Sequence, residues 1–238
     1  MKIPSVDPLG QAIHDYYTFK INHPLIIHSE DFDDDEMNPS YFFRGFKEMP
    51  ELEKKALKLC RGKILDVGAC AGSHTIWLQE NGFDVTALEI SELCCDTMRK
   101  RGVRNIINDD LFLYNGETYD TILLLMNGTG IAGTLPRLSN LFVHLKKLLR
   151  QGGQILIDSS DLIYLYEDDK GFVNLDSNSK RYYGELKYQF EYKGIKSDVF
   201  PWLYTDIETM TKIVSENQLK VKQLIKGKHF DFLMQIEK

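Results

Sequence analysis

The sequence predicts an α/β protein with a doubly wound, mostly parallel sheet that carries helices on both faces. Three observations lead to this prediction. Between residues 61 and 158, apolar segments of strand length alternate with amphipathic segments of helical length, as they do in repeated βαβ units. Residues 122–126 are continuously apolar, which is typical of a central strand covered on both faces. The strand expected at 64–67 runs directly into a glycine-containing turn, a common ligand-binding arrangement at the edge of a parallel sheet.

The elements of this core follow one another in a regular order. Ser73 and Ser91 are placed to cap the helices that follow the first two strands. A third helix begins near Pro136 and ends before Gly152, with leucines at helical spacing between them. We expect the strands at 64–67, 85–89, 105–108, 120–126 and 154–158, and the first two helices at 75–80 and 91–101.

We expect one domain over residues 1–238, in which 61–158 form the core and three segments are added to it. Residues 1–60 are expected to form an N-terminal helical cap, with helices near 8–17 and 51–60. Residues 159–204 are expected to form a β insertion after the fifth strand, because apolar and polar residues alternate over 186–192. Residues 205–238 predict a helix with Thr205 in its capping box, then a C-terminal antiparallel hairpin over 220–225 and 230–236. The number of elements matches a single open sheet.

The bulk properties narrow the functional class. The chain has 238 residues and a net charge of −6, with a pI near 5.6, which disfavours nucleic acid as a partner. No secretory signal and no apolar run of membrane-spanning length is found, so we expect a cytoplasmic protein without a membrane partner. The four cysteines lack metal or redox spacing and are expected to be reduced thiols. The oligomeric state is not predicted.

The turn after the first strand indicates the kind of ligand. Residues 63–74 contain glycine at positions 68 and 72 but not the third glycine that a dinucleotide loop requires. Asp66 would repel a diphosphate, whereas it would attract the ammonium group of a methionine-derived ligand. Cys70 lies between the two glycines, and cysteine adopts a positive φ less freely than glycine. The loop therefore favours an amino-acid head group over a phosphate.

Residues 65–72, Leu-Asp-Val-Gly-Ala-Cys-Ala-Gly, resemble the first motif of class I S-adenosylmethionine-dependent methyltransferases, with Cys70 in place of the usual middle glycine. The resemblance implies that Glu89, at the end of the second strand, binds the ribose hydroxyls, and that Asp110, rather than Asp109, contacts the adenine amino group. Residues 119–123 are similar to the opening of the family's fourth strand. S-adenosylmethionine is the implied cofactor, and its expected site comprises Asp66, Gly68, Ala69, Cys70, Gly72, Ser73, His74, Glu89, Ile90, Asp110, Leu111, Met126, Asn127 and Gly128.

The loop after the fourth strand, 126–133, is rich in glycine. Family members place a residue that orients the nucleophile there, so Asn127 is the candidate for holding the accepting atom. A loop that merely ends the strand is the alternative. We expect a small-molecule acceptor, held by the cap and the insertion, and its identity is left open.

Two other functions remain open on the sequence: an NAD(P)-dependent oxidoreductase on a related fold, and a non-catalytic S-adenosylmethionine-binding protein.

Several further residues have two interpretations each. Arg44 is a candidate partner for the cofactor's carboxylate, with a solvated surface arginine as the alternative. His74 is expected to be structural or adjacent to the cofactor rather than a base. The acidic run 30–36 is expected to be a solvated loop, without a metal. Candidates for an aromatic lining near the sulfonium are Tyr16, Tyr17, Tyr41 and Phe42.

Overall fold

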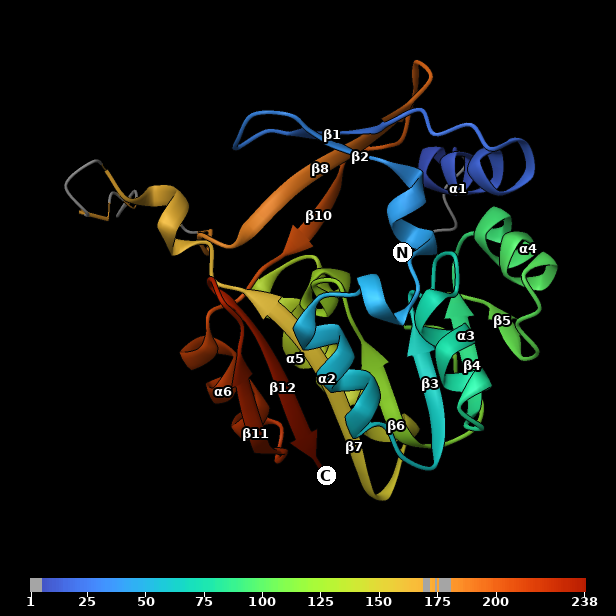
Figure 1. Ribbon diagram of the computed structural model, residues 1–238. Helices are drawn as coiled ribbons and strands as arrows, with labels where there is room; N and C mark the ends of the chain where they lie inside the picture. The colour runs from blue at the N-terminus through green and yellow to red at the C-terminus, as the bar shows by residue number, and fades with distance from the viewer. Residues whose placement is uncertain (1–5, 169–171, 174, 176–180) are drawn as a thin grey trace.

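The computed structural model describes residues 6–168, 172, 173, 175 and 181–238. Two sheets are present in this part of the chain (Figure 1). A seven-stranded sheet with helices on both faces forms the lower part of the view. A five-stranded sheet, called the second sheet below, lies above the upper ends of its central strands. Sequence patterning predicts the first sheet well and the second one only in part.

The seven-stranded sheet has the order β11-β12-β7-β6-β3-β4-β5. The five strands from β7 to β5 are parallel to one another. Strand β12 runs antiparallel to β7, and β11 at the sheet edge runs antiparallel to β12. The chain order reverses between β3 and β6, so the carboxyl ends of these two strands meet at a topological switch point, where open α/β sheets bind ligands. The strands are β3 (Lys63–Val67), β4 (Asp84–Glu89), β5 (Ile106–Asn108), β6 (Tyr119–Leu124), β7 (Leu149–Ser160), β11 (Lys220–Lys226) and β12 (Asp231–Glu237).

The helices cover both faces of this sheet, as predicted. On one face, Leu52 and Leu57 of α2 and Leu78 of α3 pack against strand residues such as Ile64 and Leu156. On the other face, leucines of α5 and Met210 of α6 pack against residues of the opposite pleat. Successive side chains of each strand point to opposite faces of the sheet, so each strand contributes buried residues to the apolar clusters on both faces. The helices are α2 (Glu51–Leu59), α3 (Ser73–Glu80), α4 (Glu92–Lys100), α5 (Leu135–Leu148) and α6 (Ile207–Glu216).

Two of the predicted helix caps are wrong. Helix α3 begins at Ser73 itself, with Gly72 as the N-cap at φ 81°. The Ser73 hydroxyl instead donates to the carbonyl of Phe42 at 2.6 Å, which ties the helix to the N-terminal region. Helix α6 is capped by Asp206, whose Oδ1 accepts from the Thr209 amide at 2.8 Å, and not by Thr205. The predicted cap Ser91 is confirmed, since it accepts from the Cys94 amide at 3.1 Å.

The second sheet corrects the expectation of a single open sheet. The alternating strand of the insertion pairs with residues 25–29, in the region expected to be a helical cap. Residues 25–29 in turn pair with residues 35–37, which include the end of the acidic run that was expected to be a solvated loop. The physical reason is that a strand with one apolar face needs both backbone partners and cover for that face. The order is β10 (Phe200–Leu203), β8 (Glu185–Tyr192), β1 (Leu25–Ser29) and β2 (Asp35–Met37), with β9 (Ile195–Lys196) paired to β8.

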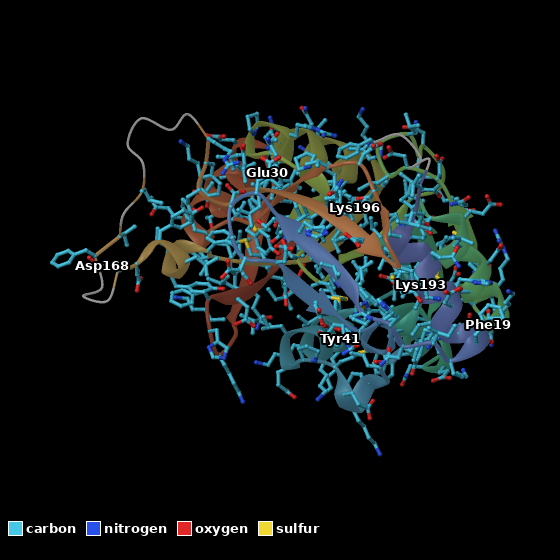
Figure 2. All side chains as sticks on the ribbon, turned by 90° about the horizontal axis from the view of Figure 1, so that it is seen from above. Phe19, Glu30, Tyr41, Asp168, Lys193 and Lys196 are labelled. Carbon is cyan, nitrogen blue, oxygen red and sulfur yellow. The ribbon has the colours of Figure 1, made fainter. Side chains whose placement is uncertain are left out.

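Helix α1 (Pro8–Phe19) joins the second sheet to the core. Its Asp15 accepts hydrogen bonds from Lys193 Nζ at 2.6 Å and from the Tyr192 hydroxyl at 3.2 Å. Tyr192 is the last residue of β8, and Lys193 follows it directly. Its Tyr17 hydroxyl donates to the Lys100 carbonyl at the end of α4, at 2.8 Å. Figure 2 shows Lys193 beside this helix. In the part of the chain that is described, no helix has the length and apolar character needed to cross a bilayer.

Candidate active site

A cavity of about 910 Å³ lies between the two sheets. Its floor is formed by the loops that follow β3, β4 and β6, at the switch point of the seven-stranded sheet, and its roof is one face of the second sheet. The predicted cofactor residues come together here: all of them line the cavity except Gly72. Gly72 is the N-cap of α3 and packs against α4 and the residues after it: an added Cβ would lie 3.0 Å from Met98 and 3.1 Å from Val103.

The loop after β3 is held in a compact bend. The Gly68 amide donates to the Leu88 carbonyl, and the Cys70 amide donates to Glu89 Oε2, each at 2.8 Å. Cys70 adopts φ 50° even though it has a side chain, so it takes the left-handed conformation that glycine adopts more freely. A Cβ at Gly68 would have only Ile131 near it, at 3.8 Å, so the backbone at this position is open to the cavity.

The two predicted acids occupy different environments on the floor. Glu89 is buried and accepts from the amides of Cys70 and Ser91; burial raises the pKa of Glu89, and these two hydrogen bonds lower it by less. Asp110 is buried as well, and its Oδ1 accepts from the Phe112 amide at 2.9 Å. Each carboxylate is therefore oriented by backbone N–H groups and lines the cavity, as a side chain that binds a polar ligand must.

Asp66 lies at the base of the same loop. It is buried, its Oδ2 accepts from the Thr75 hydroxyl at 2.6 Å, and burial raises the pKa of Asp66. Thr75 belongs to α3, so this contact joins the end of β3 to the helix that follows the loop.

Arg44 is not the solvated surface arginine of the alternative interpretation, and it lines the cavity. It is buried and forms an ion pair with both oxygens of Glu53, at 2.7 and 2.5 Å, while its guanidinium lies over the Tyr41 ring at 4.1 Å. His74 Nε2 lies 2.7 Å from the same carboxylate. Burial acts to raise the pKa of Glu53, but the hydrogen bond and charge of His74, together with Arg44, lower it overall. Glu53 gave no sequence signal, because it lies on an ordinary amphipathic helix.

The loop after β6 is bound to β7 and β10. Met126 and Asn127 both have positive φ angles, and the amides of Met126 and Gly128 donate to Asp158 at 3.1 and 3.0 Å. Burial raises the pKa of Asp158 to about 6. The side chain of Asn127 donates to the Leu203 carbonyl at 3.0 Å. Its Oδ1 accepts from the hydroxyls of Thr129 and Ser159, at 3.2 and 3.1 Å.

The roof contains an aromatic stretch, residues 200–204, for which the sequence leaves two interpretations open: lining an apolar pocket, or fixing the hairpin to the sheet. In the structure Phe200, Trp202 and Tyr204 line the cavity. Of the four aromatic candidates, Phe42 lines the cavity, whereas Tyr16 and Tyr17 pack against Phe43. The lining aromatics of the roof are Tyr188 and Phe190 of β8, Phe200 and Trp202 of β10, and Tyr204 directly after β10. The alternation in β8 was visible in the sequence, but Tyr188 and Phe190 were not among the candidate lining residues.

The acidic run lies at the rim of this cavity. Asp33, Asp34 and Asp35 line it and are exposed, and Asp34 pairs with His28 at 2.7 Å. Among the residues that the structure describes, no group of three or more His, Cys, Asp or Glu side chains is arranged to hold a metal ion.

Comparisons with known proteins agree with this geometry. A family model described as a methyltransferase domain matches residues 65–157. Comparison with curated protein sequences gives no match. Among solved structures, an S-adenosylmethionine-dependent methyltransferase from Bacteroides fragilis in complex with S-adenosyl-L-homocysteine is 42% identical, with a TM-score of 0.90. The match covers 99% of this chain and 98% of that one.

Two more distant structures share the fold. An S-adenosylmethionine-dependent methyltransferase from Clostridium acetobutylicum is 13% identical, with a TM-score of 0.60, covering 82% of this chain and 92% of that one. A sugar N-methyltransferase from Streptoalloteichus is 15% identical, with a TM-score of 0.55, covering 82% and 91%. The Bacteroides protein decides between the two cofactor classes that the sequence left open, because its identity extends over nearly the whole chain. This chain belongs to the S-adenosylmethionine-dependent methyltransferases with the class I fold.

Proposed function

We propose that this protein transfers the methyl group of S-adenosylmethionine, held on the cavity floor, to a small-molecule acceptor held under the second sheet. One observation carries the proposal: the first-motif loop, Glu89 and Asp110 line a single cavity whose opposite wall comes from other parts of the chain. The S-adenosyl-L-homocysteine complex of the 42%-identical Bacteroides protein supports the cofactor assignment. The roof supports a small-molecule acceptor, because a roofed cavity of this volume suits a cofactor and a small acceptor.

The residues present fit such a cofactor. Gly68 leaves the backbone accessible where the methionine part would lie, and Asp66 would attract its ammonium group. The Glu89 carboxylate would accept hydrogen bonds from the ribose hydroxyls, and Asp110 would accept from the adenine amino group. The bound cofactor would supply a methyl group on a sulfonium, whose sulfur leaves as a neutral thioether and is therefore a good leaving group. The protein's task is then to align the acceptor and to exclude water.

We propose a positioning role for Asn127. Its amide holds the Leu203 carbonyl and therefore fixes the strand that forms part of the roof, next to the loop that lines the floor. By this contact it would set the distance between the acceptor and the cofactor, as a nucleophile-orienting residue of the family is expected to do.

The experiment is calorimetric titration with S-adenosylmethionine, S-adenosylhomocysteine and NAD. We expect binding of the first two and none of NAD. Glu89→Ala should weaken S-adenosylhomocysteine binding by about tenfold or more, because two charge-assisted hydrogen bonds are lost. Glu92→Ala, at an exposed position three residues along the chain, is the matched control and should bind as the parent does.

A parent protein that ignored S-adenosylmethionine, or a folded Glu89→Ala variant with parental affinity, would contradict the site. Formation of S-adenosylhomocysteine from S-adenosylmethionine with a panel of small acceptors separates the enzyme from a non-catalytic binding protein. No formation with any acceptor class would favour the binding protein.

Three wider expectations remain proposals. The two sheets are proposed to act as one domain over residues 1–238, because the cavity needs a wall from each. The cytoplasm is proposed as the compartment, where Cys60, Cys70, Cys94 and Cys95 would stay free thiols, as they are in the structure. Nucleic acid stays disfavoured as an acceptor, on the net charge of −6.

A further inference from the structure

One face of the second sheet is almost entirely apolar and forms the roof of the cavity. The register places Phe190 opposite Ile27 and Trp202 opposite Leu186, and directly opposed residues lie on the same face. All four line the cavity. The residues between them in the strands, such as Gln189 and Lys187, belong to the other face. The apolar face is therefore turned towards the cavity rather than towards a packed core. Figure 1 shows the second sheet above the upper ends of the central strands of the seven-stranded sheet.

The aromatic rings on this face form a continuous cluster. Phe200 lies at its centre, with ring centroids 4.9 Å from Phe190, 6.2 Å from Trp202 and 6.4 Å from Tyr188. All three contacts are edge-to-face, so the rings support one another. They stand on strands rather than on loops, which limits their movement. A rigid aromatic wall binds planar, apolar molecules with little loss of side-chain entropy.

The position of Trp202 depends on the glycine-rich loop after β6. A Cβ at Gly130 would lie 2.0 Å from Trp202 Cε2, so the indole packs directly on the glycine backbone. The glycine has no positive φ that would otherwise require it. Gly130 thus allows the roof to approach the loop that lines the floor.

Tyr204 supplies a polar group beside this apolar wall. Its hydroxyl lies 3.3 Å from that of Tyr188, and both residues line the cavity. The backbone on each side is fixed, because the Leu203 carbonyl accepts from Asn127 and the Thr205 amide donates to Ser159 Oγ at 2.9 Å. Burial raises the pKa of Tyr204, so the hydroxyl stays protonated and serves as a hydrogen-bonding group rather than as a base.

The charges around the cavity disfavour an anion. Among the described residues that line it, Arg44 is the one arginine and there is no lysine, and Arg44 is paired with Glu53. Asp33, Asp34 and Asp35 add negative charge at the rim. An anionic acceptor would lose its hydration without gaining an unpaired lysine or arginine side chain as a partner.

On the proposed methyltransferase function, we propose that this aromatic face is the acceptor subsite. It takes a planar, apolar molecule without negative charge, and Tyr204 hydrogen-bonds the hydroxyl or amino group that is methylated. In the transfer, the lone pair of the acceptor oxygen or nitrogen forms the bond to the methyl carbon. The electrons of the broken carbon–sulfur bond stay on sulfur, which becomes a neutral thioether, and the acceptor's proton passes to water.

The test uses Trp202 as a reporter. Trp77 packs on Phe46, with ring centroids 4.6 Å apart, and does not line the cavity, so Trp77→Phe leaves Trp202 as the single tryptophan. With S-adenosylhomocysteine bound, 2-naphthol and 2-naphthylmethylamine should change Trp202 fluorescence at concentrations about tenfold lower than 2-naphthoate does.

In calorimetry, Phe190→Ala should weaken 2-naphthol binding by about tenfold and leave S-adenosylhomocysteine binding unchanged. Phe19→Ala, an exposed aromatic at the end of α1, is the control (Figure 2). Gly130→Ala should also weaken 2-naphthol, because it displaces Trp202. Equal or tighter binding of 2-naphthoate, or parental 2-naphthol binding by Phe190→Ala, would overturn the subsite.

Tyr204→Phe tests the hydrogen bond apart from the shape of the site. It should remove the preference for 2-naphthol over 2-methylnaphthalene, an effect of about fivefold, and leave 2-methylnaphthalene binding unchanged. A structural role alone would weaken both ligands together, and that result would overturn the assignment of Tyr204. If the protein binds S-adenosylhomocysteine but none of the naphthyl compounds, the acceptor inference fails and the methyltransferase proposal stands. If it does not bind S-adenosylhomocysteine, the proposed function itself fails.

Discussion

Cys70, Met126 and Asn127 adopt positive φ angles on the floor of the cavity, although each has a side chain. Such conformations cost on the order of 1 kcal/mol or more each, and they persist only where neighbouring contacts hold them. Here the Cys70 amide is held by Glu89 and the Met126 amide by Asp158. The two carboxylates therefore shape the two loops that meet at the switch point, in addition to any role towards a ligand.

Asp158 gives a testable pH dependence at the scale of one residue. Because burial raises the pKa of Asp158 from 3.8 to about 6, the folded protein binds this proton more tightly than the unfolded chain does. The resulting stabilisation is complete below about pH 3.8 and is lost as the pH rises through about 6. A carbon-13 NMR titration of labelled aspartate should show this carboxyl titrating near pH 6, with Asp158→Asn identifying the signal. Titration near pH 4 would contradict the environment described.

At the scale of elements, helix ends were harder to predict than helices. Both Thr205 and Asp206 are plausible caps for α6, and local sequence cannot choose between them. Asp206 is the cap because its carboxylate reaches the Thr209 amide and also accepts from the Tyr182 hydroxyl at 2.5 Å. Tyr182 belongs to the insertion and lies 24 residues before Asp206 in the chain. Its hydrogen bond to Oδ2 holds the Asp206 carboxylate, whose Oδ1 caps the helix.

We expect Asp206→Ala to lower the free energy of unfolding by about 1–2 kcal/mol, since the cap is lost and Tyr182 loses a partner. Asp206→Asn should retain most of the stability, because asparagine also caps helices well. Urea unfolding of the parent and both variants measures the difference. An Asp206→Ala variant as stable as the parent would show that α6 does not depend on this cap.

At the scale of the whole molecule, the position of the second sheet depends on α1. Asp15 is buried and joins α1 to Tyr192 and Lys193. Asp15→Ala should leave the buried Tyr192 hydroxyl without this partner and loosen the sheet. Hydrogen–deuterium exchange should then be faster in β1 and β8, with β3 and β6 still protected.

The matched control is Glu30→Ala, which removes the exposed ion pair with Lys187 on the same sheet. Exposed pairs contribute little, so its exchange should be parental. Figure 2 shows Glu30 well separated from Lys193 on this sheet. If exchange rose equally in both sheets of Asp15→Ala, the link would be global rather than local.

The parallel core and the glycine turn after its first strand could be predicted from the sequence, because they depend on patterns within a few residues of one another. Glu89 and Asp110 were expected from the resemblance of the surrounding motifs to the family, and both line the cavity. Strand and helix periods and the glycine turn are local properties that tertiary packing did not override. The tertiary structure alone decided the second sheet, the burial of Arg44 against Glu53 and the contacts of Asp158. Each of these joins segments distant in the chain, such as β1 and β8, whose pairing follows from backbone hydrogen bonding and burial of a shared face rather than from either segment's own pattern.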